Sequence, residues 1–300
     1  GHFERSPMYH ALALEDVLDL INLCRTSGHS SDAYGLLTLL EPRVASMLHW
    51  LQALCHPDDE IGLFNDAAFG ISPAPLELLA YAERLGFWAG QPSTPASAGV
   101  AADASLNVTS LQPSGYVRID APNASALLDV APIGPDYLPG HAHADTLSFE
   151  LSVFGQRVFV NSGTSVYGIS AERLRQRGTA AHNTVIVDDT DSSEVWSGFR
   201  VARPARPLDL SIEEAPESVR VSCGHTGYQQ IVKPPVTHVR EWRMTATALT
   251  IVDELRPVVF ANAHTAEARY HLHPAITLLP QLSSDALNLQ LSAGREIPLV

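Results

Sequence analysis

One stretch of the sequence decides the fold: GHAHADTLSFELSV, residues 140–153. Apolar side chains occupy every second position from Leu147 to Val153, and polar side chains fill the positions between them. This alternation predicts a β-strand with one buried face and one solvated face. His141 and His143 share the parity of the apolar residues, so we expect both imidazoles to face inward at the leading edge of the strand.

The chain before this stretch has the spacing of helices. Ser6 and Pro7 mark a helix start, because serine caps a first turn and proline is tolerated in it. Apolar residues recur three and four positions apart, which predicts a helix from Ser6, a second from about Pro42 and a third over 76–85. The intervening residues 58–72 are rich in Gly, Asn and Asp, which predicts a long ordered loop of the kind that lines a cleft.

The period changes after a stretch without charge. Residues 91–99 have the composition of a connecting segment, and we place a linker at 91–104. Beyond it, short β-type runs are separated by turn residues, at 116–119, 147–153, 158–160, 184–187, 219–222, 240–244, 249–252 and 268–272. We therefore expect an α+β chain, helical over 1–90 and an antiparallel β-sandwich over 105–300.

Composition excludes several classes of function. The chain has 300 residues, 45% of them hydrophobic, which is enough for a substantial core. Its net charge of −14 disfavours nucleic acid as a partner, because that binding needs a basic surface. No apolar run approaches the roughly 20 residues of a membrane span. Cys24, Cys55 and Cys223 are widely spaced, which predicts buried thiols and no disulfide framework.

A third histidine extends the pattern at 140–145. His182 lies in AHNTV, residues 181–185, directly before another predicted strand. Together with His141 and His143 it could complete a three-nitrogen cluster for a transition metal. The alternative is a set of histidines satisfied by hydrogen bonds.

Several runs together resemble the heparinase II/III-like polysaccharide lyases. They are GHFERSPMYH (1–10), LFND (63–66), the segment from 139 through NSGT (161–164) and AHNT (181–184) to SSEVW (192–196), REWR (240–243) and YHLHP (270–274). The resemblance implies an incomplete α/α toroid followed by a large antiparallel β-sandwich. Residues 1–90 would be the end of that toroid, and its earlier helices would precede Gly1.

The resemblance also implies a reaction, β-elimination at a uronic acid. Its three tasks are to neutralise the carboxylate, to remove the C5 proton and to protonate the leaving glycosidic oxygen, and none needs an organic cofactor. Tyr9 and His141 match the family's acid and base. The family's neutralising Asn or His lies upstream of Gly1, so we expect this chain alone to hold an incomplete site. A tyrosine suits proton transfer once a cation lowers its pKa from about 10, although Tyr9 could instead serve packing.

The resemblance bears on the metal as well. In zinc-containing members of the family, the positions that match His143, Asn161 and His182 bind the ion. Asn161 stands where those members have a carboxylate, and a neutral amide is a poorer zinc ligand. Structural zinc and a hydrogen-bonded cluster that braces the sandwich therefore both remain open.

Strand geometry sets a condition on this cluster. A tight hairpin at Gly155-Gln156 pairs Asn161 with Glu150, which lies roughly 23 Å of straight strand from His143. The three ligand positions can meet only if residues 140–145 fold back as a loop.

Other side chains are candidates for binding an acidic sugar. Tyr167 and Arg177 lie in the loop before His182, and His10 stands next to Tyr9. His10 and His2 could also substitute for Tyr9 in proton transfer. Arginine grips carboxylates through two parallel hydrogen bonds. The alternative for each is an exposed loop residue or a solvated or capping histidine.

Two further kinds of residue have two possible readings each. Asp145 could orient one of the imidazoles from behind. Trp88, Trp196 and Trp242 could stack on sugars, although a tryptophan in a strand-rich domain more often belongs to the core.

These observations favour a polysaccharide lyase that cleaves an acidic, uronate-containing glycan, and the resemblance implies a periplasmic or secreted setting. One alternative is a catalytically inactive glycan-binding or scaffold homologue, motivated by Asn161. Another is a cupin-like metal-dependent enzyme, suggested by His-x-His and a distant His on a β scaffold, although the helical N-terminal part does not fit it.

Overall fold

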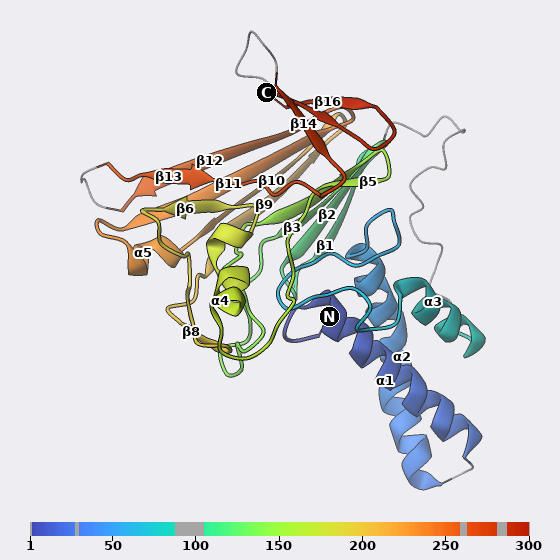
Figure 1. Cartoon of the computed structure of the whole chain (residues 1–300). Helices are drawn as coiled ribbons and strands as arrows, with labels where there is room; N and C mark the ends of the chain where they lie inside the picture. The colour runs from blue at the N-terminus through green and yellow to red at the C-terminus, as the bar shows by residue number, and fades with distance from the viewer. Residues whose placement is uncertain (1, 28–29, 88–104, 259–262, 281–286, 300) are drawn as a thin grey trace.

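The computed structural model describes residues 2–27, 30–87, 105–258, 263–280 and 287–299 (Figure 1). Its helical elements are α1 (Pro7–Thr26), α2 (Ser31–Ala53), α3 (Pro75–Arg84), α4 (Ala171–Arg177), the 3-10 turn η1 (Thr179–Ala181) and α5 (Gly227–Ile231). Its strands are β1 (Asn107–Leu111), β2 (Tyr116–Ala121), β3 (Ala124–Asp129), β4 (Phe149–Val153), β5 (Gln156–Phe159), β6 (Val185–Val187), β7 (Glu194–Trp196), β8 (Arg200–Ala202), β9 (Pro207–Ala215), β10 (Ser218–His225), β11 (Val236–Thr245), β12 (Leu249–Pro257), β13 (Ala266–Ala268), β14 (Thr277–Pro280), β15 (Leu287–Gln290) and β16 (Glu296–Leu299). The predicted linker at 91–104 lies outside the described residues.

The helices α1, α2 and α3 pack on one another around an apolar core of their own. The predicted start of α1 is confirmed, since the Ser6 side chain accepts a hydrogen bond from the Tyr9 amide at 3.2 Å. The predicted start of α2 near Pro42 is wrong: the helix begins at Ser31, capped by Ser30, and runs through Pro42. Burial of the helix face outweighs the single hydrogen bond that proline removes.

Two antiparallel sheets form the predicted sandwich. One has the order β1-β2-β3-β4-β5 and the other β12-β11-β10-β9. A single apolar core lies between them, in which Phe149 and Ile119 of the first sheet meet Val221 and Trp242 of the second. Trp242 is fully buried, so it belongs to the core and is no platform for a sugar.

The helical part covers the outer face of the five-stranded sheet (Figure 1). A small core joins Trp50 and Phe64 to Tyr116 and Leu127 of the sheet. Trp50 donates its indole N–H to the Ser114 hydroxyl at 2.8 Å. The sheet is therefore sandwiched between helices and a second sheet.

This cover overturns the expected solvated face of the strand at 147–153. Glu150 and Ser152 are 0% and 1% exposed, because His56 lies against both. Its Nδ1 is 2.7 Å from the Ser152 hydroxyl, and its Nε2 is 2.8 Å from a Glu150 carboxylate oxygen. The polar residues of this strand bind another layer of the protein instead of water.

The strand also begins later than the alternation predicts. β4 starts at Phe149, and Leu147 has a left-handed φ of +66° that breaks the extended run. Residues 140–148 form turns and bends ahead of the strand. The histidine stretch is thus a loop, which meets the condition for bringing His143 close to His182.

The thiols are only partly as expected. Cys223 is buried, whereas Cys24 and Cys55 are half-buried, and all three are free. Within the described part of the chain, no helix combines the length and apolar character of a membrane crossing.

Candidate active site

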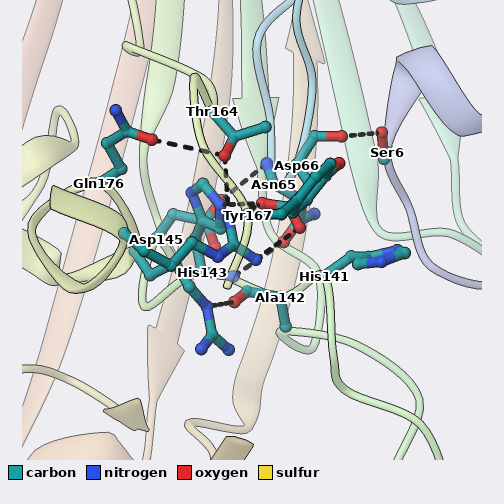
Figure 2. Close-up of polar contacts among 12 residues, drawn as sticks. Ser6, Asn65, Asp66, His141, Ala142, His143, Asp145, Thr164, Tyr167 and Gln176 are labelled. Atoms are coloured by element: carbon teal, nitrogen blue, oxygen red, sulfur yellow. Dashed lines mark hydrogen bonds and ion pairs between the residues drawn. The ribbon is translucent and has the colours of Figure 1, made fainter. Parts of the chain in front are cut away.

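The loop 140–148 meets two helical-part segments: the residues before α1 and the loop that carries Asn65 and Asp66. In Figure 2 the His141 ring points away from the cluster that surrounds His143 and Asp66. The two histidines therefore have separate surroundings, although only Ala142 lies between them.

His141 is a partly exposed imidazole held by a carboxylate. Its Nδ1 is 3.0 Å from an oxygen of Glu4, and 25% of its side chain is exposed. A carboxylate accepts a hydrogen bond from Nδ1–H, so the neutral ring keeps a lone pair on Nε2. Among the described residues nothing bonds to this Nε2. The geometry is that of an oriented base with an open nitrogen.

Tyr9 lies face to face with His141. The ring centroids are 4.4 Å apart and the planes differ by 4°. The Tyr9 hydroxyl is 2.9 Å from the hydroxyl of Tyr167, which lies in the loop before α4. Burial and this hydrogen bond raise the pKa of Tyr167. The structure thus brings together three predicted site residues, Tyr9, His141 and Tyr167.

Sequence reasoning missed Glu4. It lies 137 residues from His141, and a lone acid ahead of a helix carries no spacing signal. Only its place in the GHFERSPMYH run pointed to it.

His143 is the centre of a buried ion pair. Its Nε2 is 2.8 Å from Oδ1 of Asp66, whose carboxylate also binds the Arg173 guanidinium through both oxygens. All three side chains are 0% exposed. Burial lowers the pKa of His143 despite Asp66, whereas the bonds from His143 and Arg173 outweigh burial and lower the pKa of Asp66. An anionic Asp66 thus accepts a hydrogen bond from Nε2–H of a neutral His143, and the Nδ1 of His143 keeps its lone pair.

Hydrogen bonds to backbone groups tie the same segments together. Asn65 accepts from the His143 amide at 3.2 Å, and the Asp66 amide donates to the His141 carbonyl at 3.1 Å. The Ser6 hydroxyl donates to the Asp66 carbonyl at 2.6 Å, so the first turn of α1 is fixed as well (Figure 2). Asp66 and Arg173 were not singled out by sequence reasoning, and the LFND run was the signal for the first.

Arg177 does not face the open side of the site. It is fully buried, and its Nε donates to the Ala142 carbonyl at 2.9 Å. Burial and the nearby charge of Arg173 lower the pKa of Arg177 to about 10. Its position corrects both expected roles, since it supports the loop between the two histidines.

His10 is likewise directed inward. It is 1% exposed, its Nε2 bonds to the Met47 carbonyl at 2.8 Å, and its Nδ1 accepts from the His2 amide at 3.1 Å. Burial lowers the pKa of His10 to about 4. The structure packs it against the Trp50 ring, with 4.3 Å between the centroids, as a neutral buried residue.

His182 and Asn161 pair beside His143. His182 Nδ1 is 3.1 Å from Asn161 Oδ1, and the His143 and His182 ring centroids are 5.2 Å apart. Burial and then His143 hold the pKa of His182 well below its usual value. His143 Nδ1, His182 Nε2 and Asn161 Nδ2 are buried without a partner among the described residues.

The donor set tests whether these residues suit zinc. With the amide oxygen on His182 Nδ1, the ring keeps a lone pair on Nε2, but Asn161 offers only its NH2 group. With the amide turned over, Asn161 offers oxygen, but the proton moves to His182 Nε2. In either orientation His182 and Asn161 together offer a metal only one lone pair. A carboxylate in place of the amide would allow each residue to offer one. The described residues contain no group of three His, Cys, Asp or Glu placed for a metal. This cluster, as it stands, does not fit a zinc site.

Asp145 makes no hydrogen bond to an imidazole in the described structure. It accepts from the Asn65 amide at 3.4 Å, and burial raises its pKa to about 7. Glu4 and Asp66 fill the orienting role instead. Trp196 is 52% exposed on β7, and Trp88 lies outside the described residues.

Comparison with known proteins gives a consistent result. The family model described as "Heparinase II/III-like, C-terminal" matches residues 104–297. The chain is similar to the structure of heparan sulfate lyase HepC from Pedobacter heparinus, with TM-score 0.66 and 17% identity over 98% of this chain and 44% of that one. A heparinase III structure gives TM-score 0.68 and 17% identity over 99% of this chain and 46% of that one. No curated protein sequence matches.

The chain thus spans less than half the length of these solved structures. At this identity the likeness concerns the fold. The family match covers both sheets of the sandwich and replaces the cupin-like alternative.

Proposed function

The chain belongs to the heparinase II/III-like family, and from that premise we propose that it forms part of a polysaccharide lyase acting on a uronate-containing glycan. The observation that carries the proposal is the open Nε2 of His141, oriented by Glu4 and stacked on Tyr9. The solved structures it resembles include a heparan sulfate lyase, which favours a glycosaminoglycan as substrate.

The proposed reaction divides two proton transfers between two side chains. His141 Nε2 takes the C5 proton, the electron pair forms the C4–C5 double bond, and the C4–O bond breaks. The Tyr9 hydroxyl gives its proton to the leaving glycosidic oxygen. No electron acceptor is needed, because elimination is not an oxidation.

The helical part is proposed to be the end of an α/α toroid, and the completed toroid would supply the group that neutralises the uronate. Arg173 cannot take that role, because each of its N–H groups already donates within the protein. We place the protein in the periplasm or outside the cell, where an acidic polysaccharide is met.

For the cluster of His143, Asn161 and His182, the proposal is a metal-free brace. The cluster offers two unpartnered imidazole nitrogens and one amide, and it lacks the anionic ligand that a zinc site would need. The buried Asp66–Arg173 pair supplies the rigidity that a metal would otherwise give.

The test is the ultraviolet absorbance of an unsaturated uronate, followed with the complete protein on heparan sulfate and other uronate glycans. We expect product with at least one glycan, and loss of roughly 100-fold or more in kcat for His141→Ala. His49→Ala, at an exposed histidine of α2, is the matched control and should keep full activity. Binding of a glycan without any product would instead support the inactive homologue.

A further inference from the structure

Two exposed aromatic rings border His141 on the side of α4. Tyr167 is 49% exposed and Phe199 is 42% exposed. Their centroids are 6.0 Å apart with planes at 27°, and they lie 6.0 and 6.2 Å from the His141 centroid. We call these two rings the aromatic ledge. Exposed apolar surface beside a polar site is typical of a binding surface.

Arg173 supports the ledge from below. Its guanidinium carbon lies 5.2 Å from the Tyr167 centroid and 5.4 Å from the Phe199 centroid, within the range of cation–π attraction. Its five N–H groups donate to Asp66, the Thr164 hydroxyl and the carbonyls of Gly198 and Gly140. A fully bonded, buried guanidinium cannot shift without breaking these bonds.

The turn that carries Phe199 is also fixed. It joins β7 to β8 and presses on the loop before α4, since a Cβ at Gly198 would stand 2.6 Å from the Gly168 carbonyl oxygen. The Phe199 Cβ lies 3.7 Å from where a side chain at Gly140 would begin, next to His141. The ring is therefore solvent-facing and held in place, and a preorganised surface loses little entropy on binding.

We propose that the aromatic ledge is a saccharide-stacking subsite, which holds the C–H face of the pyranose next to the bond that His141 and Tyr9 cleave. The idea rests on the proposed function and adds Phe199 to its binding residues. The Tyr167 hydroxyl is already bonded to Tyr9 and Arg173 lies over one side of each ring, so the exposed side of the ledge remains for the ligand. Phenylalanine offers no hydrogen bond, so Phe199 selects an apolar sugar face and not a charge.

The experiment compares Phe199→Ala, Phe199→Tyr and Phe154→Ala in the complete protein. Phe154 is a matched control: it is also 42% exposed and stacks on an arginine, Arg295, but it lies at the turn between β4 and β5. We measure kcat and KM for heparan sulfate, and the Kd of a heparan sulfate tetrasaccharide in a His141→Ala background.

For Phe199→Ala we expect KM and Kd to rise roughly tenfold while kcat changes little, and Phe199→Tyr to restore both. Phe154→Ala should match the parent. If the protein makes no product, the Kd values still decide. A tenfold loss of affinity specific to Phe199→Ala supports the subsite and contradicts only the proposed lyase activity. An unchanged Kd for Phe199→Ala, or no tetrasaccharide binding by the parent, overturns the subsite.

Discussion

His141 and His143 stand on either side of Ala142, yet they meet opposite surroundings. His141 is a quarter exposed, lies among the rings of Tyr9 and Tyr167 and keeps Nε2 open. His143 is fully buried and bonds the Asp66–Arg173 ion pair. Each imidazole is hydrogen-bonded to a carboxylate through one ring nitrogen, so this partner does not explain the difference between the two histidines. The difference teaches that two histidines of one motif can differ in the exposure of the second ring nitrogen, and the role proposed for His141 rests on that exposure.

The largest effect is expected from weakening the buried cluster of His143, Asp66 and Arg173, the buried side of the site. Arg173→Lys should lower the free energy of unfolding by about 3–5 kcal/mol, because one ammonium cannot replace the fork and leaves Asp66 poorly paired. Arg175→Lys, two residues along the same helix, is the control: its pair with Glu172 is exposed, so we expect less than about 0.5 kcal/mol. Urea unfolding of both variants checks this, and equal losses would show that burial of the pair is irrelevant.

A second change would turn the buried side into a metal site. Asn161→Asp supplies the missing anion, so a carboxylate oxygen could join His143 Nδ1 and one nitrogen of His182 as zinc ligands. We expect stoichiometric zinc by metal analysis and, at zinc about 100-fold above Kd, stabilisation of about 2.7 kcal/mol. Asn161→Asp with His143→Ala should lose the metal. Tight zinc in the unmodified protein would overturn the metal-free brace.

A smaller effect is expected on the open side. Glu4→Gln removes the charge behind His141 Nδ1, and kcat should fall roughly 10- to 100-fold while stability changes little. Glu83→Gln, at an exposed acid of α3, serves as the control. Steady-state rates decide, and unchanged kcat in Glu4→Gln would remove Glu4 from the site.

His10 is adjacent to Tyr9 in sequence but belongs with the buried histidines. Burial lowers its pKa from 6.5 to about 4, so below about pH 6.5 the unfolded chain binds a proton that the folded chain excludes. Stability should therefore fall with decreasing pH, by about 1 kcal/mol from His10 between pH 7 and pH 5.5. His10→Gln should reduce the fall in unfolding free energy between these two pH values by that amount. An unaltered pH dependence would place His10 in contact with solvent.

The sequence pattern predicted those elements that depend on neighbouring residues along the chain. The cap at Ser6, the helix near 76–85, the β-sandwich and the core position of Phe149 follow from capping and periodicity. The start of α2 was wrong because packing outweighed a proline. The solvated face of β4 was wrong because a neighbouring layer, invisible to alternation, covers it.

The candidate site divides in the same way. The family motifs pointed to Tyr9 and His141, and the structure stacks them. Glu4 and Arg173 were missed because their partners lie far away in sequence and no spacing rule connects them. Arg177 was expected as an exposed or sugar-facing cation, since a sequence does not show that its guanidinium turns inward to a carbonyl.

The most direct test of the division between the two histidines is a paired measurement of kcat and unfolding free energy for His141→Ala and His143→Ala in the complete protein. His141→Ala should lose roughly 100-fold or more in kcat and less than about 0.5 kcal/mol of stability. His143→Ala should lose about 2–4 kcal/mol, because it leaves buried Asp66 without one of its partners. The account is contradicted if His143→Ala keeps its stability and loses activity as His141→Ala does.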